Sequence, residues 1–280
     1  MRRSGVVWPG EPVEHPVVYL PVFPGTNCDY DMAKAFEREG AQVRTSVFCN
    51  LTAEDIERST RQMAQMIDEC HILALSGGFS AGDEPDGSGK FIANVLQNNL
   101  VKEAIGRLDE RGGLILGICN GFQALVKSGL LPFGKIGELS EESPTLFHND
   151  IHRHISQIVT TRVASVASPW LRGFQLGELH SIAASHGEGK FVASKELAQQ
   201  LRQNGQIAFQ YADSTGEATM HSPENPNGST EAIEGIISPE GRVLGKMGHS
   251  ERYEDGLMKN IAGNKEQNLF RNAVAYFRKN

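Results

Sequence analysis

A short apolar run that ends in a cysteine between two glycines constrains this chain most. Residues 113–123 read Gly-Leu-Ile-Leu-Gly-Ile-Cys-Asn-Gly-Phe-Gln, so Cys119 directly follows a predicted buried strand. Gly-x-Cys-x-Gly is the thiol form of the Gly-x-Ser-x-Gly elbow, a sharp strand-to-helix turn that exposes a nucleophile and has room only for glycine beside it. The free N–H groups of the next helix favour a thiolate. The pattern predicts a nucleophilic Cys119; the alternative is a buried structural cysteine.

Strands and helices alternate in the first half of the chain. Strands are expected over 17–23, 42–48 and 72–75, and helices from an Asp29 N-cap to Gly40, over 53–68 and over 90–109. This alternation predicts an α/β fold, a doubly wound, mostly parallel, flavodoxin-like sheet flanked by helices. Residues 1–16, with three prolines, are expected to be an irregular leader or linker remnant, and residues 17–280 a single domain.

The second half is expected to be rich in β-strands. Turn residues 238–241 connect two apolar segments, 233–237 and 243–247, which predicts a hairpin. Asn264 and Gln267 resemble a capping box that starts a final helix. Further strands are expected over 155–163, 191–192 and 207–211, and the buried face of the last helix over Leu269, Phe270, Ala273, Val274 and Phe277.

Composition excludes several classes of protein. With 27 Lys and Arg against 34 Asp and Glu, the net charge is −7, which argues against nucleic acid as a partner. The four cysteines contain no Cys-x-x-Cys pair, which argues against a disulfide scaffold or zinc ribbon and favours a reducing, cytoplasmic location. No apolar run is long enough to span a membrane. No Walker loop or dinucleotide fingerprint occurs, so neither ATP nor NAD is expected on this chain.

A cysteine nucleophile needs a histidine base that a third group orients. His249 and Glu251 follow the predicted hairpin, and residues i and i+2 of an extended segment point to the same side. His186 is a rival base with Glu188 two residues on, and sequence spacing does not choose between the two. The alternative without a catalytic role is that His249 is an ordinary surface histidine. The glycines around His186 suggest a loop whose backbone comes close to a ligand or to the rest of the protein.

Attack on an amide creates an oxyanion that needs preorganised N–H donors. The backbone N–H of Asn120, directly after the nucleophile, is one expected donor. Gly77 or Gly78 supplies the other, from the glycine-rich loop of residues 76–83. Because that loop and Cys119 both follow strands of a parallel sheet, they are expected to face each other.

Three histidines near residue 150 raise the alternative of a metal site. His148, His152 and His154 lie close to Asp150, but their spacing matches no zinc motif. His152 and His154 are expected on one face of a strand. A polar strand edge with no metal is the preferred interpretation.

Six motifs, in this order, resemble the class I glutamine amidotransferases of phosphoribosylformylglycinamidine synthase. The resemblance covers about residues 17–279. The motifs are Phe-Pro-Gly-Thr-Asn-Cys-Asp (23–29), Ser-Gly-Gly-Phe-Ser-Ala-Gly-Asp (76–83), Gly-Ile-Cys-Asn-Gly-Phe-Gln (117–123), Ser-His-Gly-Glu-Gly (185–189), Asn-Pro-Asn-Gly-Ser (225–229) and His-Ser-Glu-Arg (249–252).

The resemblance implies that Cys119 forms a glutamyl thioester with L-glutamine, that His249 is acid and base, and that Glu251 orients His249. It also implies that Gln123 helps to hold the substrate, and His186 is expected on the substrate side. Ammonia would pass to a synthetase subunit or domain that uses ATP and Mg and amidates formylglycinamide ribonucleotide. No cofactor is expected on this chain. The alternative is a cysteine hydrolase of the same fold that acts on peptides or glutamyl conjugates without a partner.

The chain departs from the family pattern in two places. The usual Pro-His-Pro-Glu-Arg is Gly-His-Ser-Glu-Arg over 248–252, so this strand end is expected to be less stiff. Residues 84–89 also differ, which puts the shape of that loop in doubt. The proline-rich leader fits part of a single-chain synthase, and Met1 fits a separate subunit; both remain open.

Overall fold

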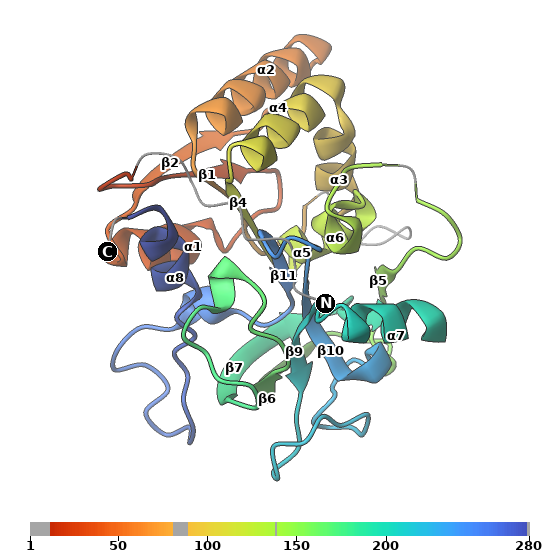
Figure 1. Cartoon of the computed structure of the whole chain (residues 1–280). Coiled ribbons are helices and arrows are strands. Elements are labelled where there is room, and N and C mark those ends of the chain that lie inside the picture. The colour runs from red at the N-terminus through yellow and green to blue at the C-terminus, as the bar shows by residue number, and fades with distance from the viewer. Residues whose placement is uncertain (1–11, 81–88, 138, 279–280) are drawn as a thin grey trace.

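The computed structural model describes residues 12–80, 89–137 and 139–278 (Figure 1). The strands are β1 Val17–Val22, β2 Gln42–Val47, β3 Ile72–Leu75, β4 Leu114–Ile118, β5 Thr145–Phe147, β6 Ile155–Val163, β7 Leu179–His186, β8 Lys190–Val192, β9 Ile207–Tyr211, β10 Ile233–Ile237 and β11 Val243–Lys246. The helices are α1 Asp29–Arg38, α2 Ala53–Glu69, α3 Lys90–Gln97, α4 Asn99–Glu110, α5 Asn120–Lys127, α6 Leu130–Phe133, α7 Lys195–Gln203 and α8 Leu269–Phe277, with 3-10 turns at Pro169–Leu171, Thr230–Ala232 and Ser250–Arg252.

One large sheet runs through the molecule in the order β2-β1-β3-β4-β11-β10-β9-β6-β7. The strands from β2 to β11 pair in parallel, and those from β11 to β7 pair antiparallel. The predicted α/β sheet and the β-rich second half are therefore confirmed. The predicted hairpin is β10–β11, in which Gly235 pairs with Lys246.

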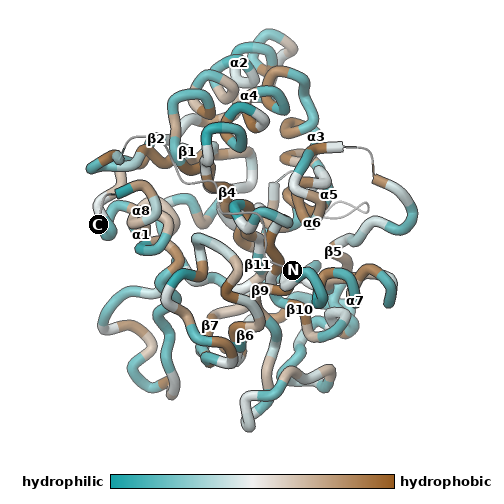
Figure 2. Tube along the Cα trace, viewed as in Figure 1, coloured by the Kyte–Doolittle hydropathy of each residue, from teal (hydrophilic) through white to brown (hydrophobic). Residues whose placement is uncertain are grey.

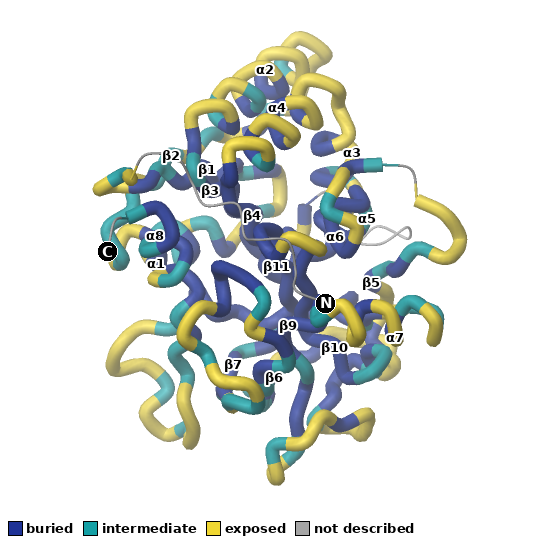
Figure 3. Tube along the Cα trace, viewed as in Figure 1, coloured by how far each residue is buried: buried dark blue, intermediate teal, exposed yellow. Residues whose placement is uncertain are grey.

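Two groups of helices cover the parallel strands. In Figure 1, α2 and α4 pack together at the top of the view, α1 and α8 lie together at its left, and β1 and β2 lie between the two groups. Phe36 of α1 meets Phe270 of α8 edge to face, with ring centroids 4.9 Å apart. The central strands are hydrophobic in Figure 2 and buried in Figure 3. Burial on both faces explains why β3 and β4 read as continuous apolar runs.

The helix predicted over 90–109 is wrong as a single element. It breaks at Asn98, which has an extended ψ of 134° and accepts a hydrogen bond from Leu100 N–H through its side chain. Leu100, which continues the i+4 spacing of the apolar residues Ile92 and Leu96, is 47% exposed, whereas Val101 is buried. Capping by Asn98 starts α4 in a new register, which a 3.6-residue pattern alone does not reveal.

Three other local predictions are wrong. Cys28, not Asp29, occupies the N-cap position of α1. The last helix begins at Leu269 because Asn264 accepts from Glu266 N–H in a local turn instead of capping a helix, although its predicted buried face is confirmed. His152 has a φ of 51° and lies in a turn before β6, so it shares no strand face with His154.

The parallel strands bring distant loops to one edge of the sheet. Segments 23–28, 76–80 and 248–252 follow β1, β3 and β11, and Cys119 follows β4. Residues 1–11 and 81–88, which include most of the predicted leader and of the divergent loop, lie outside the described residues. Within the described part of the chain, no helix is long and apolar enough to cross a membrane.

Candidate active site

Cys119 lies in a strained turn between β4 and α5. Its φ of 53° and ψ of −106° lie in a region that residues other than glycine rarely adopt, at a cost of about 1–3 kcal/mol. Its N–H donates to Lys246 O (2.9 Å), and its carbonyl accepts from Gln123 N–H (3.0 Å). The strand, turn and helix predicted around the cysteine are therefore present.

The two glycines of the elbow let α5 approach β3 closely. A Cβ atom on Gly121 would lie 2.1 Å from Leu75 O, and one on Gly117 would lie 2.7 Å from Gly121 C. Gly121 faces the backbone of Leu75, and Gly117 faces the Leu125 side chain and the backbone of Gly121, so neither position accepts a larger residue without moving the helix.

Replacing Gly121 with alanine is expected to destabilise the fold, because the new methyl group pushes α5 away from β3. We expect the free energy of unfolding to fall by about 1–3 kcal/mol. Urea denaturation followed by circular dichroism measures this change. Gly106→Ala in α4 is the control, since nothing lies within 4 Å of its Cβ position. That variant should be as stable as the parent or more so, and equal losses in both variants would contradict the packing argument.

His249 and Glu251 form a buried pair after β11. His249 Nδ1 lies 2.6 Å from Glu251 Oε1, and both residues are 3% exposed. Burial lowers the pKa of His249, but the Glu251 carboxylate and the neighbouring Cys119 and Cys28 thiols outweigh it. The net result is a pKa well above the ordinary value of the ring.

Gly77 brings His249 and Cys119 together. A Cβ atom on Gly77 would lie 2.8 Å from His249 Cε1 and 3.5 Å from Cys119 Cβ. Glu251 bonds to Nδ1 of the His249 ring. The other ring nitrogen, Nε2, is buried and has no hydrogen-bond partner among the described residues. The Cys119 thiol also lies 3.7 Å from Ser185 O, at the end of β7. The nucleophile, base and orienting carboxylate expected from the sequence thus lie in one place.

Two of the expected oxyanion donors lie next to Cys119, since Asn120 follows it directly and a Cβ on Gly77 would lie 3.5 Å from its Cβ. Gly77 O accepts from Asn27 N–H (3.3 Å) and Cys28 N–H (3.2 Å), which holds segment 76–80 against segment 23–28. Gly78 has a φ of 152°, and a Cβ there would lie 2.6 Å from Gly25 O. No described residue accepts a hydrogen bond from the N–H of Gly77, Gly78 or Asn120.

Cys28 is a second thiol at the site that sequence reasoning missed. Its Sγ lies 3.9 Å from His249 Nδ1 and 3.2 Å from the Arg252 guanidinium. Its only sequence signal is its place in the 23–29 motif, directly before α1. Ligand atoms of Cys28, His249 and Glu251 lie within 4.8 Å of one another. The 2.6 Å contact between His249 and Glu251 is a hydrogen bond, too short to hold an ion between its atoms.

Gln123 bridges α5 to the loop after β7. Its Oε1 accepts from Asn120 Nδ2 (3.0 Å), and its Nε2 donates to Glu188 O (2.5 Å). The side chain is 3% exposed, so both ends of its amide are used inside the protein.

His186 lies in a different environment from its rival. Its Nδ1 is 3.2 Å from Asn149 Oδ1, and Glu188 Oε1 instead lies 3.5 Å from His148 Nδ1. Burial, with smaller contributions from His249 and His154, lowers the pKa of His186 to about 3. The ring is therefore neutral, and none of the residues that the structure describes places a carboxylate against it, whereas His249 bonds to Glu251.

Acid should destabilise the protein through His186. The unfolded ring binds a proton below a pKa of about 6.5, but the folded ring binds one only near 3, so unfolding takes up a proton between these values. This one group should cost up to about 1.4 kcal/mol of stability per pH unit as the pH falls below 6.5. Denaturant unfolding at pH 7, 6 and 5, compared with His186→Gln, measures it. Parallel losses in both proteins would contradict the expectation.

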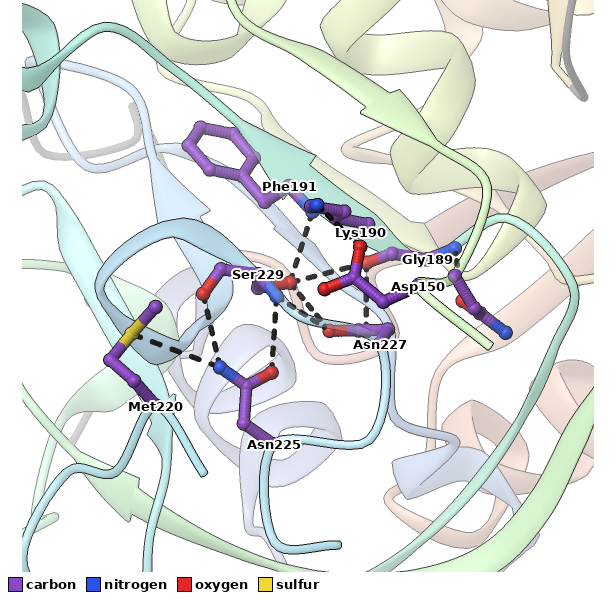
Figure 4. Close-up of polar contacts among 9 residues, drawn as sticks. Asp150, Gly189, Lys190, Phe191, Met220, Asn225, Asn227 and Ser229 are labelled. Carbon is purple, nitrogen blue, oxygen red and sulfur yellow. Dashed lines mark hydrogen bonds and ion pairs between the residues drawn. The ribbon is translucent and has the colours of Figure 1, made fainter. Parts of the chain in front are cut away.

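The Asn-Pro-Asn-Gly-Ser motif contacts the segment of residues 189–191, which follows β7 and leads into β8 (Figure 4). Asn227 Nδ2 donates to Gly189 O (2.8 Å), and Ser229 Oγ accepts from Phe191 N–H (3.0 Å). Asn225 Oδ1 accepts from Ser229 N–H (3.1 Å). The motif therefore holds the segment that follows β7 in place.

The three histidines near residue 150 do not converge. His148 lies near Glu188, and His154 Nε2 is 3.1 Å from Ser185 Oγ. Among the residues that the structure describes, they form no group of metal-ligating atoms.

Comparison with known proteins agrees with this geometry. The model of the CobB/CobQ-like glutamine amidotransferase domain matches residues 15–277. The chain is 31% identical over 257 residues to the phosphoribosylformylglycinamidine synthase subunit PurQ of Gloeobacter violaceus, covering 91% of this chain and 95% of the relative. It is 35% identical over 248 residues to that of Acaryochloris marina, covering 85% and 91%.

Among solved structures, the chain is similar to a chain of the PurLQS structure from Thermotoga maritima. The TM-score is 0.67 at 26% identity, covering 94% of this chain and 100% of the other. A family model that spans nearly the whole chain, together with relatives above 30% identity, shows that this protein belongs to the CobB/CobQ-like glutamine amidotransferase family.

Proposed function

We propose that this chain is the glutaminase half of a phosphoribosylformylglycinamidine synthase. The observation that carries the proposal is the buried arrangement in which His249, held by Glu251, lies beside Cys119 next to free backbone N–H groups. The relatives named PurQ support the choice of synthase. We treat residues 17–280 as one amidotransferase domain, because a single core cluster contains residues from Val18 to Phe277.

In the proposed reaction, the Cys119 thiolate attacks the side-chain carbonyl of L-glutamine. The N–H groups of Asn120 and of Gly77 or Gly78 stabilise the oxyanion. The protonated His249 donates its proton to the amide nitrogen as the C–N bond breaks, and ammonia leaves. His249 then removes a proton from water, which attacks the thioester and releases glutamate. Glu251 keeps the ring oriented and favours its charged form in both steps.

His186 is proposed as an acceptor on the substrate side. Asn149 Nδ2 donates to Arg153 O (3.0 Å) and His186 O (2.8 Å), so Asn149 Oδ1 faces the His186 ring as an acceptor. His186 Nδ1 must then carry the proton, and Nε2, buried and without a partner in the described part of the chain, presents a lone pair. A substrate N–H group suits that atom.

Gln123 is proposed to act on the substrate through the loop that it anchors. Because its amide already bonds to Asn120 and to Glu188 O, it sets where residues 187–189 lie beside the elbow.

A synthetase subunit or domain completes the proposed reaction. It would bind ATP and Mg and use the ammonia to convert formylglycinamide ribonucleotide into formylglycinamidine ribonucleotide, and this chain would need no cofactor. A purine biosynthetic role and four free cysteines suit the cytoplasm.

The test measures product formation from glutamine by the synthetase, with and without this chain. With its synthetase partner, the chain should support product formation from glutamine and release glutamate in equal amount. Glutamine-dependent product that appears only with this chain supports the proposal. Glutamate release that is unaffected by the partner and never coupled to amidation would favour the partner-independent cysteine hydrolase instead.

A further inference from the structure

A fully buried ion pair lies beneath the turn that carries His249, and the proposed reaction does not use it. Lys246 is the last residue of β11, and Glu234 lies beside it on β10. Lys246 Nζ is 3.2 Å from Glu234 Oε1, and both side chains are 0% exposed. Placing two charges out of water is costly, so such a pair requires a structural or functional reason.

The pair bonds to the residues on both sides of His249. Lys246 Nζ donates to Gly248 O (2.8 Å) and Ser250 Oγ (3.0 Å), which together with Glu234 uses its three N–H groups. Glu234 Oε1 accepts from Gly248 N–H (2.6 Å). The peptide groups before His249 and the side chain after it are therefore bonded to one rigid pair on adjacent strands.

Other bonds complete the support of this turn. Ser250 Oγ donates to Gln267 Oε1 (2.6 Å), and His249 N–H donates to Ala183 O of β7 (2.8 Å). The turn is thus bonded to β10, β11, β7 and the segment before α8. Since the His249 ring has to meet Glu251 on one side and Cys119 on the other, a small shift of this turn would disturb both contacts.

The residues that flank His249 suit this network. A Cβ on Gly248 would lie 2.8 Å from Glu234 Oε1 and 2.8 Å from Ile182 Cγ2, so glycine leaves room for the carboxylate. A proline at 248 would have no N–H for Glu234, and one at 250 no hydroxyl for Lys246. The less stiff strand end expected from the sequence stays a prediction, and buried hydrogen bonds hold this turn where the family pattern has prolines.

We propose that Lys246 and Glu234 are positioning residues for His249. Because the charges of Lys246 and Glu234 cancel, the pair affects the position of the His249 ring more than the charge of that ring. The inference rests on the proposed function, in which His249 transfers the proton between Cys119 and the amide.

The test replaces both charges at once with Lys246→Met/Glu234→Leu, since apolar residues of similar volume often substitute for a buried ion pair without loss of folding. In complex with the synthetase, we expect kcat for glutamine hydrolysis to fall by about 100-fold, with KM changed less than about threefold. The pH profile of Cys119 alkylation by iodoacetamide should also change. A purely structural pair would leave kcat and this profile unaltered in folded protein.

The matched control is Arg242→Met/Asp109→Leu, which removes a pair at the opposite end of β11, where Arg242 Nη2 lies 2.6 Å from Asp109 Oδ1. This control should keep the parental kcat. A folded Lys246/Glu234 double variant with parental kcat would overturn the inference. A parent without Cys119-dependent glutaminase activity would instead refute the proposed function.

If the double variant does not fold, substitutions of Ser250 test the same inference. Ser250→Ala removes the hydroxyl between Lys246 and Gln267 and should lower kcat about tenfold. Ser250→Thr keeps the hydroxyl and should restore most of the rate. Parental kcat in Ser250→Ala would count against the inference.

Discussion

Replacing Cys119 with alanine is expected to abolish amidation from glutamine while leaving amidation from ammonium chloride intact in the complete synthase. Without the thiol no thioester forms, and loss of a nucleophile that works with a base typically lowers kcat by about 10⁴-fold or more. Free ammonia bypasses this chain and reaches the synthetase directly. Initial rates with each nitrogen donor, measured on the same preparation, separate the two activities.

Cys49→Ala is the matched control for this experiment. Cys49 is a free cysteine outside the site, and its backbone N–H donates to Ser59 Oγ (3.0 Å). It should behave like the parent with both donors. A Cys119→Ala protein that still hydrolyses glutamine at the parental rate would rule out the thioester mechanism.

Replacing His249 with alanine is expected to lower kcat for glutamine hydrolysis by about 10³–10⁴-fold, since proton transfer to the leaving nitrogen is lost. His186→Gln should raise KM and lower kcat by no more than about tenfold, because a neutral ring without a carboxylate partner accepts a hydrogen bond but transfers no proton. Steady-state kinetics on both variants distinguish the two rival bases. His221→Ala, an exposed histidine in the polar segment before the Asn-Pro-Asn-Gly-Ser motif, is the control. A larger loss in His186→Gln than in His249→Ala would reverse the assignment.

Glu251→Gln tests how the His249–Glu251 pair sets the pH dependence of the reaction. The carboxylate raises the pKa of His249, so the ring keeps its proton to a higher pH than an ordinary histidine and catalysis should persist on the alkaline side. With glutamine at 251 the ring loses its proton at lower pH, and the alkaline limb of kcat/KM should move to lower pH. An unmoved alkaline limb would show that Glu251 does not control the charge of His249.

The elbow could be predicted because its cause is local. Gly117 and Gly121 are required by contacts within two or three residues of Cys119 and with the adjacent strand, and the alternation of elements predicted that strand. The β10–β11 hairpin was equally local, since a four-residue turn connects its strands. The break at Asn98 was missed because a capping side chain interrupts a helix without disturbing its apolar periodicity.

The site beyond the elbow depends on contacts between segments far apart in the chain. His249 and His186 both have a glutamate two residues on, so the tripeptide carries no information about which carboxylate reaches its ring. Only the fold places Glu251 on His249 and turns Glu188 towards His148. Cys28 joins the site from the segment between β1 and α1, a placement that no spacing rule predicts.

The sequence by itself determined the α/β architecture, the nucleophile and its glycine supports, and a short set of possible bases, because these follow from periodicity and from steric rules that act over a few residues. The tertiary structure decided which histidine is paired, that a second thiol lies beside it, and that Lys246 and Glu234 hold the turn of His249. Those features arise from side chains on separate strands that meet only when the sheet brings their ends together, and burial then sets their charges.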